Sequence, residues 1–86
     1  MPERMVTRGT AIRVAAIFEP GRRIRPVWFE RNRRRYQVVE TTYCWRDQVG
    51  DAPRIHFAVS DGEALFELIY DVKDGSWTLQ EQQAAS

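Results

Sequence analysis

Hydrophobic and polar residues alternate along much of this chain, and alternation with a period of two is typical of β-strands that are buried on one face. The clearest alternation lies in the C-terminal half, where two pairs, Asp61-Gly62 and Asp74-Gly75, separate three such segments. An Asp-Gly pair between alternating segments is a strong signal for a β-hairpin. The pattern therefore predicts a three-stranded antiparallel meander.

Two-residue turns at these pairs would set the register of both hairpins. Both turns then assign the even-numbered residues of the shared middle strand to the buried face. The facing pairs predicted in this way are Phe57 with Phe66, Ile55 with Leu68, Tyr70 with Leu79, and Val72 with Trp77.

The other face of the meander would carry His56 across from Glu67. Leu65 and Ile69 interrupt the polar residues of this face, either as lone surface residues or as the seat of a second contact. An acid–base pair of His56 and Glu67 is conceivable, but a solvent-side cross-strand pair is more often structural.

The N-terminal half predicts a strand over residues 11–18 that ends at Glu19-Pro20-Gly21, where Pro and Gly suit a type II turn. A helical turn through Ala15 and Ala16 is the competing interpretation. A further hairpin is expected to turn at Asn32-Arg33, because Asn tolerates a left-handed backbone. A two-residue and a four-residue loop centred there give the same pairs: Phe29 with Tyr36, Val27 with Val38 and Arg25 with Glu40 on one face, and Trp28 with Gln37 and Glu30 with Arg35 on the other.

In the strand that follows, the bulky side chains move from one face of the strand to the other partway along it. Bulky residues move from even positions, such as Tyr36, to odd positions, such as Tyr43 and Trp45. A β-bulge over residues 40–42 would account for this change. Residues 47–53 are expected to form a loop.

These segments predict an all-β fold of five to six antiparallel strands, rich in meanders, in a strongly curved sheet or small open barrel. The 86 residues suit a single β domain with an ordered core over about 10–82 and frayed ends at 1–9 and 82–86.

Charge is unevenly distributed along the chain. Residues 1–46 carry eleven arginines and four glutamates, whereas residues 47–86 carry two basic and eight acidic side chains. Either the first half meets an anionic partner, or the two halves face each other.

Composition argues against several classes of protein. The only cysteine, Cys44, excludes an intramolecular disulfide, and without a Cys/His cluster the usual zinc sites are missing. No catalytic motif, cofactor motif or long apolar segment is present, so we expect a cytoplasmic protein that is not an enzyme, has no cofactor and does not enter a membrane. Cys44 itself is expected to be a small buried residue.

The arginine-rich segment 22–35 is the one feature with a specific functional interpretation. Guanidinium groups bind phosphates in bidentate fashion and stack on bases. The alternative is a purely structural role, in which the arginines lie on an edge strand and either prevent aggregation through their charge or pair with glutamates. The candidate contacts for DNA or RNA are Arg25, Arg31, Arg33, Arg34 and Arg35 as phosphate ligands and Trp28 as a stacking surface.

The segment EPGRRIRPVWFERNRRRYQVVETTYCWR, followed by an acidic strand and DGSWTLQE, resembles a family of short uncharacterised bacterial proteins. Relatives of that family occur at the C-terminus of Y-family DNA-polymerase-like proteins. The resemblance covers residues 10–82 and rests on Arg25-Pro26, Arg34-Arg35-Tyr36, Trp45-Arg46 and Trp77, with Asn32-Arg33 replacing the usual turn glycine. It implies a DNA-related context and no catalytic residues.

Two functions remain open at this level. The first is a non-enzymatic module that binds nucleic acid through the arginine-rich hairpin. The second is a module for binding another protein or for homodimer formation, in which the charge-complementary halves of two chains meet.

Overall fold

The computed structural model describes residues 9–21 and 23–80 of the chain. Residues 1–8, Arg22 and residues 81–86 lie outside the described residues, and so do the ends expected to be frayed, except Gly9, which belongs to a strand and pairs with Gln80. Every regular element in the described part is a β-strand. The strands are β1 (Gly9–Ala11), β2 (Arg13–Glu19), β3 (Arg23–Arg31), β4 (Arg34–Gln37), β5 (Glu40–Val49), β6 (Ala52–Ser60), β7 (Leu65–Asp71) and β8 (Ser76–Gln80).

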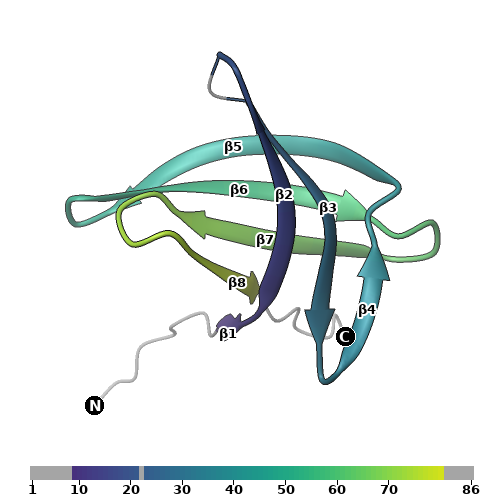
Figure 1. Cartoon of the computed structure of the whole chain (residues 1–86). Helices are drawn as coiled ribbons and strands as arrows, with labels where there is room; N and C mark the ends of the chain where they lie inside the picture. Colours follow the sequence, from purple (N-terminus) through teal and green to yellow (C-terminus); the bar gives the residue numbers. More distant parts are fainter. Residues whose placement is uncertain (1–8, 22, 81–86) are drawn as a thin grey trace, which may run out of the picture.

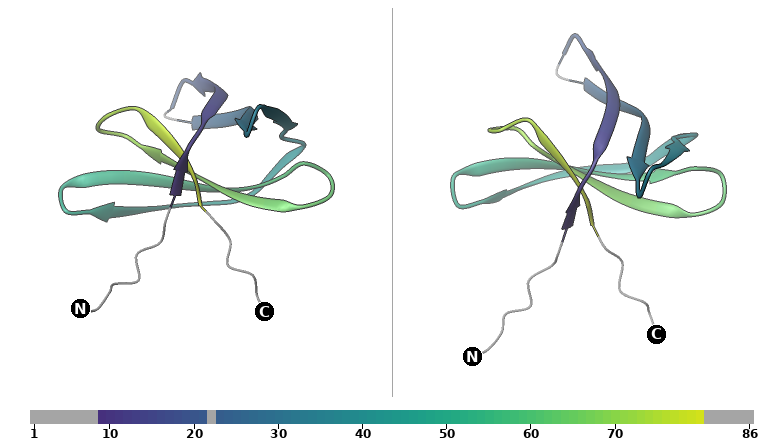
Figure 2. Two further views of the ribbon diagram at one scale, coloured as in Figure 1. Left: turned by 90° about the horizontal axis from the view of Figure 1, so that it is seen from below. Right: turned by 60° about the horizontal axis from the view of Figure 1, so that its bottom comes forward.

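The strands form two antiparallel sheets (Figure 1). Five strands pair in the order β1-β8-β7-β6-β5, and three pair in the order β2-β3-β4. Figure 2 shows the three-stranded sheet lying over one face of the five-stranded sheet, with its strands crossing those below at a steep angle. The all-β prediction is confirmed.

Two segments run from one sheet into the other, which is why more strands are present than the sequence predicts. β1 pairs with β8, and β2 pairs with β3; between them, the Ile12 amide donates to the Trp77 carbonyl at 3.2 Å. At the second corner, the Val38 amide donates to Val27 at 2.9 Å and the Val39 amide donates to Ser60 at 2.8 Å. Strands that change sheets are the usual corners of orthogonal sheet packing.

The close approach of β1 to β8 depends on Gly9. A Cβ atom at this position would overlap Cγ2 of Thr78. Any residue with a side chain at this position would require the Thr78 side chain to move.

The hydrophobic core lies between the sheets. Phe29 from β3 is fully buried and stacks on Tyr36 at 5.0 Å and meets Phe66 edge-on at 5.1 Å. The buried residues of the five-stranded sheet that complete this cluster are Ile55, Phe57, Val59, Leu68 and Leu79.

The β3–β4 hairpin confirms the sequence prediction. Phe29 pairs with Tyr36, Trp28 with Gln37 and Glu30 with Arg35. The turn is the two-residue pair Asn32-Arg33, with φ values of 52° and 66°. Trp28 lies on the outer face because it alternates with the buried Phe29. The β2–β3 register shifts after Ala15, which leaves Val27 without a facing residue on β2.

The predicted pair Arg25–Glu40 is wrong. Arg25 faces Ile17 on β2, and Glu40 faces Ser60 on β6. The chain has already left the three-stranded sheet at Val39, so Glu40 cannot continue the hairpin. The predicted bulge is present, because the β5–β6 register shifts between Thr41 and Tyr43.

The predicted loop over residues 47–53 is also wrong. β5 and β6 form a hairpin with Gly50-Asp51 as its turn, and Gly50 has a φ of 63°. The glycine supplies the left-handed backbone that such a turn requires, so the flanking polar residues are free to continue both strands.

The registers predicted for the two Asp-Gly hairpins are wrong by two residues. Phe57 faces Leu68 and Tyr70 faces Trp77, because each loop has four residues instead of two. In each loop an aspartate oxygen accepts two backbone amides: Asp61 from Glu63 and Ala64, and Asp71 from Lys73 and Asp74. These side-chain bonds stabilise the longer turns.

A slip of two residues leaves the faces unchanged. Leu68 is therefore buried as predicted, but Val72 falls into the second loop and is 46% exposed. On the opposite face Leu65 is 63% exposed, whereas Ile69 is buried, so Ile69 is not the lone surface residue that one of the two alternatives predicted. No helix that is long and apolar enough to cross a bilayer occurs among the residues described above.

Candidate nucleic-acid interface

The two sheets carry opposite charge. Described residues up to Val39, which build the three-stranded sheet, include seven arginines and two glutamates, a net charge of +5. Described residues from Glu40 onward, which build all of the other sheet except β1, include three basic and eight acidic side chains, a net charge of −5. The asymmetry along the sequence thus becomes an asymmetry between two layers.

The two layers do not neutralise each other through ion pairs. Within residues 9–21 and 23–80, every ion pair joins residues of one sheet: Arg13–Glu30, Arg25–Glu19 and Arg35–Glu30 in the basic sheet, and Arg54–Asp47 and Lys73–Asp51 in the acidic sheet. The contacts of His56 with Asp47 and Glu67 also stay within the acidic sheet. A weaker electrostatic contact joins the layers: the pKa of Asp61 is lowered mainly by the backbone amides of Ala64 and Glu63 and, to a smaller extent, by the charge of Arg34. The rest of the excess positive charge of the small sheet is available to an external anion.

Trp28 lies at the centre of the outer face of the small sheet, but it is not a bare stacking surface. The Arg35 guanidinium carbon lies 3.7 Å from the centre of the Trp28 ring, and the same guanidinium is 3.2 Å from Glu30. Arg13 reaches the other oxygen of Glu30 at 3.1 Å. The face presents a stacked cation–π pair held by a shared carboxylate.

The hairpin tip carries the least compensated charge. Arg31, Arg33 and Arg34 surround the turn, and none of them has an ion-pair partner in the described part of the chain. Arg34 lies over the Tyr36 ring at 5.6 Å. Arg33 is exposed and has the left-handed φ of 66°, a backbone that costs a residue with a side chain on the order of 1 kcal/mol.

Arg25 does not belong with these residues. It lies six residues before Arg31 on β3, about 20 Å away at the rise of an extended strand. Its guanidinium is 3.5 Å from Glu19. The structure thus brings five of the six predicted contacts together, at or next to the tip, and separates the sixth.

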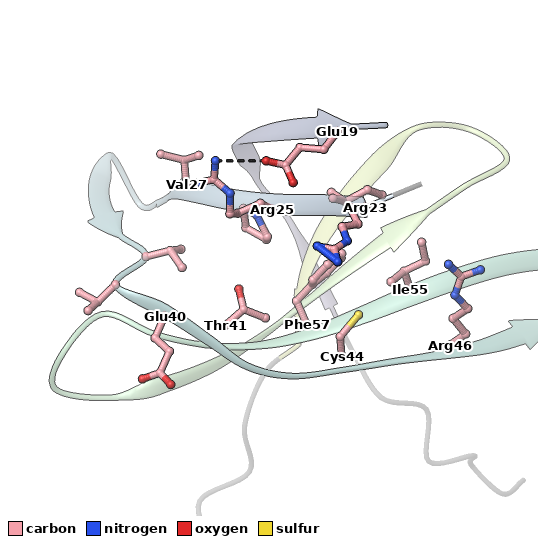
Figure 3. Close-up of a pocket in the computed structure, with 14 residues that line it drawn as sticks. Glu19, Arg23, Arg25, Val27, Glu40, Thr41, Cys44, Arg46, Ile55 and Phe57 are labelled. Atoms are coloured by element: carbon pink, nitrogen blue, oxygen red, sulfur yellow. Dashed lines mark hydrogen bonds and ion pairs between the residues drawn. The ribbon is translucent and has the colours of Figure 1, made fainter. Parts of the chain in front are cut away.

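The start of β3 borders a cleft that the sequence did not predict. The cleft has a volume of about 520 Å³ and lies between β3 and β5, with Ile55 and Phe57 on its floor (Figure 3). It exists because the three-stranded sheet covers the middle of the larger sheet but leaves the inner side of β5 open. Of the ten residues in β5, only Trp45 is even partly buried.

Three side chains of β5 point into the cleft. Thr41, Cys44 and Arg46 pair with Val59, Phe57 and Ile55, which all face the core, and so they share that face. The prediction that Cys44 is buried is therefore wrong: it lies on the inner face, but nothing covers that face and the side chain is exposed.

The uncovered face of the large sheet holds a second cluster. His56 is 6% exposed; its Nδ1 atom lies 2.8 Å from Glu67 and its Nε2 atom lies 3.1 Å from Asp47. The Trp45 ring stacks on the imidazole at 4.8 Å. The predicted contact of His56 with Glu67 is present, although Ile69 is the residue directly opposite His56.

Asp47 connects this cluster to Arg54, whose Nε and Nη2 atoms donate to the two carboxylate oxygens at 3.1 and 3.0 Å. The bonds from Arg54, together with the contact to His56, hold the pKa of Asp47 below its ordinary value of 3.8. A carboxylate with a lowered pKa stabilises the fold at pH values above its unfolded pKa, and this contribution is lost as the pH falls through the folded pKa.

We therefore expect Asp47→Asn to lower the free energy of unfolding at pH 7 by no more than about 1 kcal/mol, because the pair is partly exposed to solvent. The difference from the native protein should shrink as the pH falls toward 3. Urea unfolding at pH 7 and pH 3 measures both effects. Asp51→Asn is the control, because Asp51 is 88% exposed; a difference for Asp47→Asn that is equal at both pH values would contradict the argument.

No group of three or more His, Cys, Asp or Glu side chains that could hold a metal ion occurs in the described ranges. In comparisons with known proteins, no family model, no curated protein and no solved structure matches this chain. The resemblance to the bacterial family with polymerase-associated relatives stays a prediction.

Proposed function

We propose that this protein is a non-enzymatic module that binds nucleic acid through the basic three-stranded sheet, with single-stranded DNA or RNA as its ligand. The observation that carries the proposal is the net charge of +5 on the described residues of that sheet, none of which forms a salt bridge to the described residues of the acidic sheet beneath it. A concentrated positive charge attracts phosphates and releases their counterions.

Each group at the tip has a role in this proposal. Arg31, Arg33 and Arg34 contact phosphates, since none of their guanidinium groups forms a salt bridge within the described residues and only Arg34 is near enough to a carboxylate, that of Asp61, to affect its pKa. The Trp28–Arg35 pair offers a flat surface against which a base stacks after it displaces or slides along the guanidinium. Sequence tolerance is expected, because stacking and phosphate contacts distinguish bases weakly.

The backbone at Arg33 gives independent support. Glycine is the favoured second residue of a turn with two positive φ values, and arginine there carries a conformational cost. A residue that is kept at such a cost is a candidate for a function that its side chain performs. Phosphate binding is the function that fits a solvent-exposed arginine.

The corner strands also favour a strongly curved, open-barrel arrangement, which extends beyond the two sheets described above. Small curved β bodies frequently present one face to single-stranded nucleic acid, although this support is analogy at the level of the fold. A cytoplasmic location, as the sequence suggests, would give such a module access to DNA and RNA.

Arg33→Gly separates binding from stability. Glycine relieves the backbone cost, so the variant should be as stable as the native protein or more stable, while its affinity for a single-stranded oligonucleotide should fall about tenfold through the loss of a phosphate contact. Fluorescence anisotropy with a labelled oligonucleotide, at low and physiological salt, measures the affinity. Urea unfolding measures the stability.

Lys73→Gln is the matched control, because Lys73 is an exposed cation in a loop of the acidic sheet and the substitution also removes one positive charge. It should change affinity less than twofold, a limit set by screening over more than a Debye length. Equal losses in both variants, or binding that does not weaken with salt, would refute the hairpin as the site.

A second candidate, self-association, is supported by the exposed edge strand β5. Val39, Tyr43 and Val49, which lie on this strand or just before it, are 68%, 64% and 55% exposed. An exposed edge with apolar side chains can pair with the same edge of another chain. Light scattering tests this candidate, and a monomer at both low and high salt would rule it out.

A further inference from the structure

The cleft between β3 and β5 combines an apolar floor with two guanidinium groups that form no salt bridge to any described residue. Arg23 comes from β3 and Arg46 from β5, so the groups stand on opposite walls. Neither has an ion-pair or hydrogen-bond partner in the part of the chain that the structure describes. Figure 3 shows the Arg23 side chain extending from its strand toward Phe57 on the floor.

The acidic residues on the cleft rim do not oppose this charge. Glu19 is bonded to Arg25, whose guanidinium turns away from the floor in Figure 3. Glu40 pairs with Ser60, on the face of the strand opposite to Thr41 and its core-facing partner Val59, so its side chain leaves the cleft. The electrostatic preference of the cleft is therefore for an anion.

The two arginines favour a phosphate monoester over a carboxylate. A carboxylate has two oxygens, which one guanidinium fork occupies, whereas a terminal phosphate offers three oxygens and up to two negative charges for two forks. The walls between the arginines are apolar, with Pro26, Val27 and Val38 above and Ile55 and Phe57 below. A flat, weakly polar body fits such a space, and a volume of about 520 Å³ is in the usual range for small-molecule sites.

We infer that the cleft binds the phosphate monoester of a nucleotide, with the phosphate between Arg23 and Arg46 and the base against the apolar floor. Two sources share this chemistry: a free nucleoside monophosphate and the 5′-phosphorylated end of a strand. The site is separate from the hairpin tip, so it needs none of the tip arginines.

The first test is calorimetric titration with adenosine monophosphate, adenosine and inorganic phosphate. The monophosphate should bind more tightly than either fragment. Arg23→Gln and Arg46→Gln should each weaken its binding about tenfold, because each removes a charged hydrogen-bond donor. Lys73→Gln should leave it unchanged. Equal affinity for adenosine, or equal losses in the control, would overturn the inference.

Cys44 gives a second readout that does not depend on affinity. It is the only cysteine in the chain and lies on the cleft wall, so its alkylation by iodoacetamide can be followed by mass. Saturating adenosine monophosphate should slow this alkylation several-fold in the native protein, since a ligand on the floor covers the thiol. Binding without protection would place the nucleotide elsewhere and refute the site.

The source of the phosphate is decided with oligonucleotides. The same oligonucleotide is compared with a 5′-phosphate and with a 5′-hydroxyl. Tighter binding of the 5′-phosphorylated oligonucleotide, if this preference is lost in Arg46→Gln, identifies the strand end as the ligand. Equal binding of both oligonucleotides leaves the free nucleotide as the ligand. Binding of the monophosphate without any binding of oligonucleotides would uphold the cleft and refute the hairpin proposal. Binding of oligonucleotides without any binding of the monophosphate would uphold the hairpin proposal and refute the cleft.

Discussion

Replacing Phe29 with alanine is expected to destabilise the protein by about 4 kcal/mol. Phe29 is fully buried, and its ring contacts Tyr36 within its own sheet and Phe66 in the sheet below. The substitution therefore removes apolar surface and aromatic contacts at the same point where the two layers meet. A chain of this length is stabilised by roughly 4–13 kcal/mol, so a measurable fraction of the variant should be unfolded at 37 °C.

Urea unfolding, followed by tryptophan fluorescence, measures the loss. The matched control is Phe18→Ala, which removes the same side chain from a position that is 58% exposed and that meets Tyr70 edge-on at 5.7 Å. We expect this control to lose no more than about 1 kcal/mol. Similar losses in the two variants would mean that Phe29 does not join the two layers.

Replacing His56 with alanine is expected to cost about 2–4 kcal/mol. The imidazole is the one buried polar side chain among the described residues, and its removal leaves a gap beneath Trp45 and takes a hydrogen bond from Glu67. It also leaves the carboxylates of Asp47 and Glu67 without the ring nitrogen that each of them contacts. A missing partner for buried or half-buried polar groups is among the larger single-residue costs.

Tyr43→Ala is the control for this variant, because Tyr43 packs on Trp45 at 5.4 Å and is 64% exposed. Its loss should stay below about 1 kcal/mol. His56 and Tyr43 both contact Trp45, but only His56 is buried and contacts carboxylates. If His56→Ala were as mild as Tyr43→Ala, the carboxylates would not depend on the imidazole, and the cluster would have no structural role.

The sequence predicted the facing pairs of the β3–β4 hairpin correctly because a two-residue and a four-residue loop centred on Asn32-Arg33 give the same pairs. Asn32-Arg33 forms a two-residue turn, and the facing pairs of Phe29 and Trp28 follow from it. At the two Asp-Gly pairs, the same reasoning gave the correct faces but the wrong partners. The aspartates Asp61 and Asp71 each bind two amides of a longer loop, and this choice between loop lengths depends on side-chain hydrogen bonds that alternation does not reveal.

The sequence predicted the candidate site only where its residues are close together along the chain. The arginines at the tip are adjacent in sequence, so the hairpin identified them. The cleft joins Arg23 to Arg46 through the packing of two sheets, and the chain changes sheets at Val39 without a glycine or proline to mark the corner. The exposure of Cys44 also depends on how the two sheets pack, because the small sheet does not cover the inner side of β5.

The pairing of β1 with β8 has a consequence for how the protein folds. Gly9 meets Gln80, so the first and last described strands depend on each other, and β2 continues directly from β1 into the small sheet. A contact between distant parts of the chain carries a large loop-closure entropy and slows folding. During synthesis β3 and β4 can form their hairpin early, whereas the N-terminal strand has to wait until the ribosome has released β8.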